Sequence, residues 1–389
     1  MSPQLPTVGT PTAQASVWDR FRTWNRNHPA LWISAVAFLA SCLFAYGFGQ
    51  VAHWTTGARS TRLTDFCIWD CSWYSSIVSP GYDIAPRPGT SDSANWAFFP
   101  LFPLTARACK YALHVEAHTA TVLTSKLEFF TAILAFLLWL GPYLETMHDR
   151  LLAAMLVAFN PYLIYGHAGY SEPLYFTLLC LGFWALERQN WILAGLLGGA
   201  VSANRIVGVV FAVVYAIAAV REVGLRGILR DRSLKVLIGL ALCPLGLVLY
   251  SLYLYHLTGD ALASLHVHKA GWHHTITNPF ITMANSYHQH GWFRVWTVMA
   301  LGGLAVSGWL MRRRHLEYGI FLALIILIAM SGGLVWAFPR YLWWEPPLLY
   351  AIFFWLRRSL PACMVYFAFA GGMASFMVIA WFLGTNIVT

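Results

Sequence analysis

Residues 30–52 read ALWISAVAFLASCLFAYGFGQVA, an apolar run of 23 residues without a single charged side chain. About 20 apolar residues are enough for an α-helix to cross the hydrocarbon core of a bilayer. Similar runs recur along the chain between short basic or Pro- and Gly-containing segments, which predicts an all-α polytopic membrane protein. The expected bundle has about eleven transmembrane helices, at 30–52, 118–141, 151–167, 172–187, 191–203, 206–221, 235–257, 292–311, 317–338, 343–356 and 361–384.

Composition supports this fold class. Of the 389 residues, 58% are hydrophobic and only 11% are charged, whereas ordinary soluble domains carry roughly 25% charged residues. A soluble enzyme is therefore not expected. The 25 Lys and Arg exceed the 16 Asp and Glu, for a net charge of +9. Because these basic residues cluster between apolar runs, we interpret the charge as a topology signal, with membrane lipids as surroundings and no nucleic acid as partner.

The basic clusters predict an orientation. If the amino-terminal segment 1–29 is cytoplasmic, the basic residues between Arg221 and Lys235 fall on the same side, as do 312–314 and 357–358. Short cytoplasmic loops collect Lys and Arg, so this agreement favours that topology. We expect residues 30–389 to form one transmembrane domain. Three segments then face outward together, at 53–116, 258–291 and 339–342.

The first outward loop, 53–116, is long and rich in aromatic residues and contains the acid Asp70. Trp and Tyr favour a membrane interface because each has an apolar body and a polar tip. A carboxylate in such a loop is ionised near neutrality and can accept a proton from an attacking hydroxyl. The alternative is a capping or turn residue. Cys67 and Cys71 flank Asp70, and they form either a disulfide in an oxidising compartment or two free thiols.

A few charged residues elsewhere are candidates for a site. Arg205 has apolar sequence on both sides, and a cation in such a place marks a site or an ion pair. Glu172 lies at a predicted outer helix end, where it pairs with Arg205, caps its helix or touches substrate. Lys269 and Arg340 are outward cations suited to phosphate, Arg through a planar fork and Lys as a point charge. Lys126 is a third such cation, unless it only extends to the interface.

The outward loop 258–291 is rich in histidine. His-x-His and His-His spacings suit zinc, but no cysteine accompanies them. The alternative is a solvent-exposed loop that binds no metal. We expect no metal and no cofactor. The histidines are His266, His268, His273, His274, His288 and His290.

A series of motifs covers most of the chain. In order, they are Trp69-Asp70, Trp73-Tyr74, Ile77, Gly81-Tyr82, 98–103, 159–161, 170–175, 203–205, 258–260 and 339–341. This ordered series resembles the PIG-V-like mannosyltransferases of the GT-C superfamily of membrane glycosyltransferases. Two departures stand out: Cys71 replaces a small or polar residue, and 202–205 matches the Arg-containing segment only loosely.

The resemblance implies a multi-span enzyme that moves a sugar, mannose or a similar one, from a polyprenyl-phosphate carrier to a lipid, glycan or protein acceptor. Transfer would invert the sugar, take place on the non-cytoplasmic face of a bacterial inner membrane, and use Asp70 as the base. Arg205, Lys269, Arg340 and Lys126 are the cations expected at the donor phosphate. The sugar or acceptor pocket is expected to contain Trp73, Tyr74, Tyr82, Trp96, Phe99, Glu172, His268 and Tyr341.

Two other classes remain open. A transporter or lipid flippase would use Glu172, Arg205 and the histidines as a proton or substrate path. Transporters often contain two related halves, and the sequence has no internal repeat. A structural membrane subunit without chemistry would leave the membrane-embedded Arg205 unexplained.

Overall fold

The structure is a computed structural model, and every regular element in it is a helix. The predicted amino-terminal segment lies outside the described residues except for Pro29, and so do His273, His274 and His290. The described residues are 29–57, 61–88, 92–228, 233–272, 275–289, 291–333, 335 and 337–385.

Within these ranges, five helical segments are long and apolar enough to cross a membrane. The helices α10 (Ser233–Leu242) and α11 (Leu245–Thr258) bend by 44° at their junction and together make a sixth such span. The five are α2 (Pro29–Thr56), α5 (Ala117–Trp139), the 3-10 turn η5 (Ile206–Val210) continuing into α9 (Phe211–Ile228), α14 (Trp292–Arg312) and α18 (Leu360–Phe382).

The all-α polytopic class is therefore confirmed, but the described residues contain fewer full-length spans than the eleven expected. A helix rises about 1.5 Å per residue, so 14 residues reach only about 21 Å of a hydrocarbon core about 30 Å thick. The predicted span 151–167, for example, is a 12-residue helix followed by a 3-10 turn. The shorter helices are α6 (Met147–Ala158), α7 (Glu172–Glu187), α8 (Trp191–Asn204), α15 (Leu316–Met330) and α17 (Pro346–Leu356).

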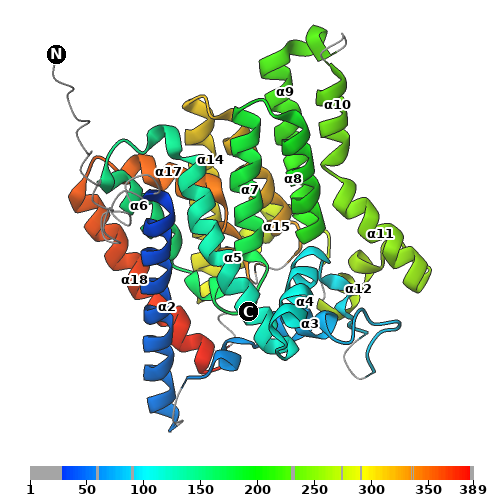
Figure 1. Cartoon of the computed structure of the whole chain (residues 1–389), viewed down its shortest axis with the longest axis vertical. Helices are drawn as coiled ribbons and strands as arrows, with labels where there is room; N and C mark the ends of the chain where they lie inside the picture. Colours follow the sequence, from blue (N-terminus) through cyan, green and yellow to red (C-terminus); the bar gives the residue numbers. More distant parts are fainter. Residues whose placement is uncertain are drawn as a thin grey trace, which may run out of the picture.

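Both long segments that the sequence predicts to face outward fold into short helices. In Figure 1, α3, α4 and α12 gather at the lower end of the bundle. A second apolar core, separate from the main one, joins them to α11 through Tyr74, Phe98, Tyr250 and Val267. The short helices are η1 (Leu63–Phe66), α3 (Asp70–Val78), η2 (Asn95–Ala97) and α4 (Leu101–Leu113) in the first segment, and α12 (Ala263–Trp272) and α13 (Pro279–His288) in the second.

The main core surrounds α5 and α7, which lie side by side in the centre of the bundle (Figure 1). Aromatic side chains such as Trp139 and Phe176 fill it. On one flank, α8 and α10 approach so closely that a Cβ at Gly195 would lie 2.2 Å from the carbonyl oxygen of Gly239. Small residues permit such close packing of membrane helices. The remaining short elements are η3 (Gly141–Tyr143), η4 (Leu163–Gly166) and α16 (Phe338–Trp343).

Candidate active site

The backbone around Asp70 is held in an unusual conformation. Trp69, directly before α3, has φ 55° and ψ −123°, outside the regions that a side chain with a Cβ normally occupies. Residues held this way cluster at functional sites. Asp70 is the first residue of α3, and its N–H donates to the hydroxyl of Tyr170 at 3.1 Å. The turn therefore places Asp70 against the loop that precedes α7.

The turn is also covalently closed. Cys67 and Cys71 form a disulfide with their Cα atoms 5.1 Å apart, so the disulfide rather than the free thiols is what the structure contains. Gly169 packs against it at φ +72°, and a Cβ at this position would lie 2.5 Å from the Cys71 sulfur. Only glycine combines this backbone conformation with so close an approach.

Four charged side chains meet beside this turn and form what we call the charge chain: Asp70, Arg340, Glu172 and Arg205. Arg340 Nη1 lies 2.8 Å from Asp70 Oδ2. Arg340 Nε and Arg205 Nη1 each lie 3.1 Å from the same oxygen, Glu172 Oε1. Two acidic side chains thus alternate with two basic side chains, and the formal charge of the group is zero.

Four elements that are distant in sequence supply these side chains. Asp70 begins α3 and Glu172 begins α7, so both carboxylates lie at helix amino termini, where the helix dipole favours negative charge. Arg340 lies on the six-residue helix α16. Arg205 lies at the break between α8 and η5, with extended backbone angles. The break in this apolar run therefore presents the cation to the site.

Tyrosine rings surround the two guanidinium groups. The Tyr341 ring lies 4.7 Å from Arg205 Cζ and 5.0 Å from Arg340 Cζ. Arg340 Nη2 also donates to the Tyr341 hydroxyl at 3.1 Å. The rings of Tyr165 and Tyr170 lie 5.3 and 5.1 Å from Arg340 Cζ. Arg tolerates such a partly dry, aromatic environment because its guanidinium is weakly hydrated and stacks on rings.

Burial is graded along the charge chain. Glu172 exposes 2% of its side chain and Arg340 exposes 8%, whereas Arg205 exposes 16% and Asp70 26%. The two ends of the chain are thus the accessible groups, and the middle holds them in place. A substrate entering the site would meet Asp70 and Arg205 first.

The sequence interpretation missed several residues that support this arrangement. Tyr170 accepts the Asp70 amide proton, and the Asn204 side chain donates to the Ser171 carbonyl at 3.1 Å. Glu345 is 2% exposed and accepts a hydrogen bond from the Tyr175 hydroxyl at 3.2 Å. A carboxylate inside an apolar run is a recognisable signal of a functional site. Glu345 falls within the predicted span 343–356 and is not among the candidates from the sequence.

Apart from Tyr341, which lies beside the two arginines, the aromatic residues expected in the pocket lie in or against the second apolar core. The Tyr74 hydroxyl meets Ser171 Oγ at 2.9 Å, and burial raises the pKa of Tyr74. The Tyr82 hydroxyl donates to the Phe98 carbonyl at 2.8 Å. The others pack on neighbouring rings or loop carbonyls: Trp73 on Trp272 and Phe98, Trp96 on the Asp83 carbonyl, Phe99 on Tyr250, and His268 on Trp272.

The two lysines lie elsewhere. Lys126 is buried in α5, where its Nζ lies 3.1 Å from His167 Nδ1 and 4.3 Å from the Phe66 ring centre. It does not extend to the interface, because the ring contacts enclose it. Lys269 is exposed on α12. Neither lysine belongs to the charge chain.

An ion pair joins His266 and Asp260 in the histidine-rich segment. His266 Nδ1 lies 2.6 Å from Asp260 Oδ2, and the hydrogen bond from His266 lowers the pKa of Asp260. Among the residues that the structure describes, no group of three His, Cys, Asp or Glu side chains is placed to hold a metal ion.

Comparison with solved structures finds membrane transferases. The archaeal oligosaccharyltransferase AglB from Archaeoglobus fulgidus, in complex with an inhibitory peptide and a dolichol-phosphate, matches 94% of this chain at 12% identity with a TM-score of 0.50. The apo form of the Archaeoglobus fulgidus oligosaccharyltransferase matches the same share at 12% identity, with a TM-score of 0.45. In both cases the chain covers 56% of the other protein's length.

No protein-family model matches the sequence. No curated protein matches it either. The identity to the solved structures is low, so the likeness concerns the fold. The chain has an all-α polytopic membrane fold similar to that of AglB.

Proposed function

We propose that this protein is a GT-C glycosyltransferase that moves a sugar, mannose or a related hexose, from a polyprenyl-phosphate carrier to an acceptor hydroxyl. The observation that carries the proposal is the charge chain, in which the partly exposed carboxylate of Asp70 contacts Arg340, and Arg340 is joined to Arg205 through Glu172. The AglB structure, which contains a dolichol-phosphate, supports a lipid-phosphate donor. The series of motifs resembling the PIG-V-like family supports mannose as the sugar.

Asp70 is the base in this proposal. Its Oδ2 contacts Arg340, while Oδ1 has no hydrogen bond within the described ranges. The carboxylate takes the proton of the acceptor hydroxyl as the hydroxyl oxygen attacks C1 of the sugar. The bond between C1 and the phosphate oxygen breaks, and its electron pair remains on the polyprenyl phosphate. Attack opposite the leaving group inverts the configuration at C1.

The two arginines receive the charge that develops on the phosphate. Guanidinium groups bind phosphate through paired N–H donors, and such contacts are stronger in a partly dry site than in water. Arg340 now contacts Asp70 through Nη1. A donor phosphate that binds this nitrogen competes with Asp70, so donor binding would release Oδ2 toward the acceptor. Arg340 and Arg205 are thus the principal phosphate ligands that we propose, with Lys269 and Lys126 in lesser roles.

The remaining groups shape the pocket. The aromatic cluster adjoins the charge chain through the contact between Tyr74 and Ser171. We propose that Trp73 and Tyr341, which are only partly buried, face the sugar. We further propose that transfer needs no metal, because cationic side chains already meet the phosphate. The site would face the periplasm of a bacterial inner membrane, with a lipid, glycan or protein as acceptor.

The test is sugar transfer by purified protein in proteoliposomes, using a labelled polyprenyl-phosphate mannose and membrane extracts as the acceptor source. Loss of a general base typically costs about 10²- to 10⁴-fold in rate, and we expect a loss of this size for Asp70→Asn. The matched control is Asp65→Asn, because Asp65 lies in the same loop with a similar exposure of 31% and pairs with His53.

Equal transfer by wild type and Asp70→Asn would overturn the base assignment. Flux of labelled donor across the vesicle membrane without any transfer would instead favour the transporter class. A wild-type protein that transfers no sugar from any polyprenyl-phosphate donor would contradict the proposed function as a whole.

A further inference from the structure

A second pocket lies at the end of the bundle away from Asp70. Helix α7 begins at Glu172 in the charge chain and ends at Glu187, which lines this pocket. At about 1.5 Å of rise per residue, the two carboxylates are separated by about 22 Å along the helix. The pocket has a volume of about 320 Å³, at the lower end of the range for small-molecule sites. The proposed sugar transfer does not use it.

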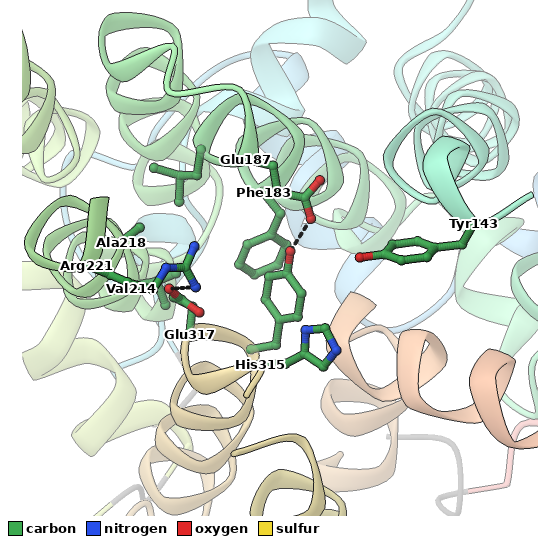
Figure 2. Close-up of a pocket in the computed structure, with 10 residues that line it drawn as sticks. Tyr143, Phe183, Glu187, Val214, Ala218, Arg221, His315 and Glu317 are labelled. Carbon is green, nitrogen blue, oxygen red and sulfur yellow. Dashed lines mark hydrogen bonds and ion pairs between the residues drawn. The ribbon is translucent and has the colours of Figure 1, made fainter. Parts of the chain in front are cut away.

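The pocket combines aromatic rings with uneven charge. Tyr143, Phe183, Tyr318 and His315 supply four rings around it, and Figure 2 shows Tyr143, Phe183 and His315 among the lining side chains. Three of the rings pack on one another: Phe183 lies 5.0 Å from Tyr318, and His315 is stacked on Tyr318 at 5.8 Å. The fourth, Tyr143, packs on Phe354 at 5.1 Å. Such packing fixes the wall in place before any ligand arrives.

Its charged groups leave an excess of negative charge. Two carboxylates, Glu187 and Glu317, line the pocket with a single guanidinium, that of Arg221. Arg221 is already engaged, since it pairs with Glu317 and with Glu222. Burial lowers the pKa of His315, which disfavours a positive charge on this imidazole. The lining therefore favours a cation.

One oxygen of the Glu187 carboxylate is available to accept a hydrogen bond from a ligand. The Trp139 indole N–H donates to Glu187 Oε1 at 3.0 Å, and the Tyr318 hydroxyl donates to the same oxygen. The other oxygen, Oε2, has no hydrogen-bond partner in the part of the chain that the structure describes. Two donors thus orient the carboxylate and leave one oxygen for a ligand.

We propose that this pocket binds an ammonium group, with Glu187 Oε2 as its acceptor and the rings of Tyr143 and Tyr318 as its walls. An ammonium is attracted to aromatic faces, and a carboxylate at the edge of such a wall adds a charged hydrogen bond. The group can come from the headgroup of a membrane lipid such as phosphatidylethanolamine, or from a free amine. Both sources share the same chemistry.

Two binding measurements separate these sources. The first is native mass spectrometry of the full chain in detergent, with equal amounts of phosphatidylethanolamine and phosphatidylglycerol. The second is calorimetric titration with free ethanolamine. We expect retention of the ammonium lipid at least about tenfold above phosphatidylglycerol if a headgroup is the ligand, or saturable ethanolamine binding if a free amine is.

The variants give the decisive comparison. Glu187→Gln keeps the oxygen that accepts from Trp139 and Tyr318 but removes the charge, so we expect a loss of at least about tenfold in the preference or affinity. Tyr143→Leu keeps apolar volume and removes a ring, and a smaller loss is expected. The matched control is Glu145→Gln, an exposed acid that pairs with Arg357 outside this pocket. Gel filtration and thermal unfolding check that each variant is folded.

Three results would overturn the inference: wild-type protein with neither a lipid preference nor ethanolamine binding, Glu187→Gln with unchanged binding, or Glu145→Gln with the same loss as Glu187→Gln. None of these results bears on sugar transfer at Asp70, so the two proposals fail separately.

Discussion

Replacing Arg340 by lysine separates the charge of this side chain from its geometry. Three nitrogens of the guanidinium contact three different partners: Asp70 at 2.8 Å, Glu172 at 3.1 Å and the Tyr341 hydroxyl at 3.1 Å. An ammonium keeps the positive charge but is a single point on a flexible stem. Arg340→Lys therefore retains long-range attraction for a phosphate and loses the fork that orients it.

The expected size of the effect follows from these contacts. A hydrogen bond to a charged group contributes about 1.5–3 kcal/mol, and tenfold in rate corresponds to about 1.4 kcal/mol. Losing one oriented phosphate contact should thus lower kcat/KM for the donor by about 10- to 150-fold in Arg340→Lys. Arg340→Gln removes the charge as well as the fork. Removing one preorganised donor aimed at developing charge lowers the rate by about 10²- to 10³-fold, and we expect a loss of this size.

The assay is the initial rate of transfer at donor concentrations well below half-saturation. Arg294→Gln is the control, because Arg294 is an exposed cation on α14 that donates to the Tyr287 carbonyl. We expect wild type and this control to have the same kcat/KM for the donor. The value for Arg340→Lys should be lower than theirs and higher than that for Arg340→Gln. A lysine variant equal to wild type, or a control as impaired as Arg340→Gln, would refute the role of the fork.

Three further outcomes are expected. Glu172→Gln leaves two guanidinium groups without their shared carboxylate, which should cost about 3–5 kcal/mol of stability and lower the thermal unfolding temperature in detergent. The control Glu116→Gln, at the exposed start of α5, should unfold at the wild-type temperature. Equal unfolding temperatures for Glu172→Gln and wild type would contradict a stabilising role of the charge chain. Cys67 and Cys71 should resist maleimide until reduced, and alanine at both should cost about 2 kcal/mol, since the bridge closes a short loop; labelling before reduction would contradict the disulfide. Transfer should survive EDTA, and activity restored only by added metal would contradict a metal-independent site.

The sequence predicts much of the fold class but not the lengths of its helices. Apolar runs and basic clusters identify a polytopic bundle, because charged side chains are costly inside the bilayer and therefore gather in the loops between the helices. They do not separate a full span from a short helix packed inside protein. The run 343–356 illustrates this, since α17 begins at Pro346 and Glu345 lies buried before it. Breaks that depend on tertiary contacts, such as the 44° bend between α10 and α11, leave little trace in composition.

For the site, scarcity of charge in the sequence indicates which residues to consider. Four of these candidates, Asp70, Glu172, Arg205 and Arg340, lie together in the structure, and the pairing of Glu172 with Arg205 is one of the alternatives that the sequence leaves open. The contact between Asp70 and Arg340 spans 270 positions and depends on how α16 packs. No local pattern contains that information. The contact between Lys126 and His167 is hidden for the same reason, because the two residues are 41 positions apart.

The central claim is that Asp70 acts in the chemical step rather than in donor binding. The most direct measurement is single-turnover transfer by Asp70→Asn, with the enzyme first saturated with labelled polyprenyl-phosphate mannose and donor affinity measured in parallel. We predict a transfer rate lowered by about 10²- to 10⁴-fold with donor affinity within a few-fold of wild type. A wild-type transfer rate in Asp70→Asn, or a loss confined to donor affinity, would contradict the claim.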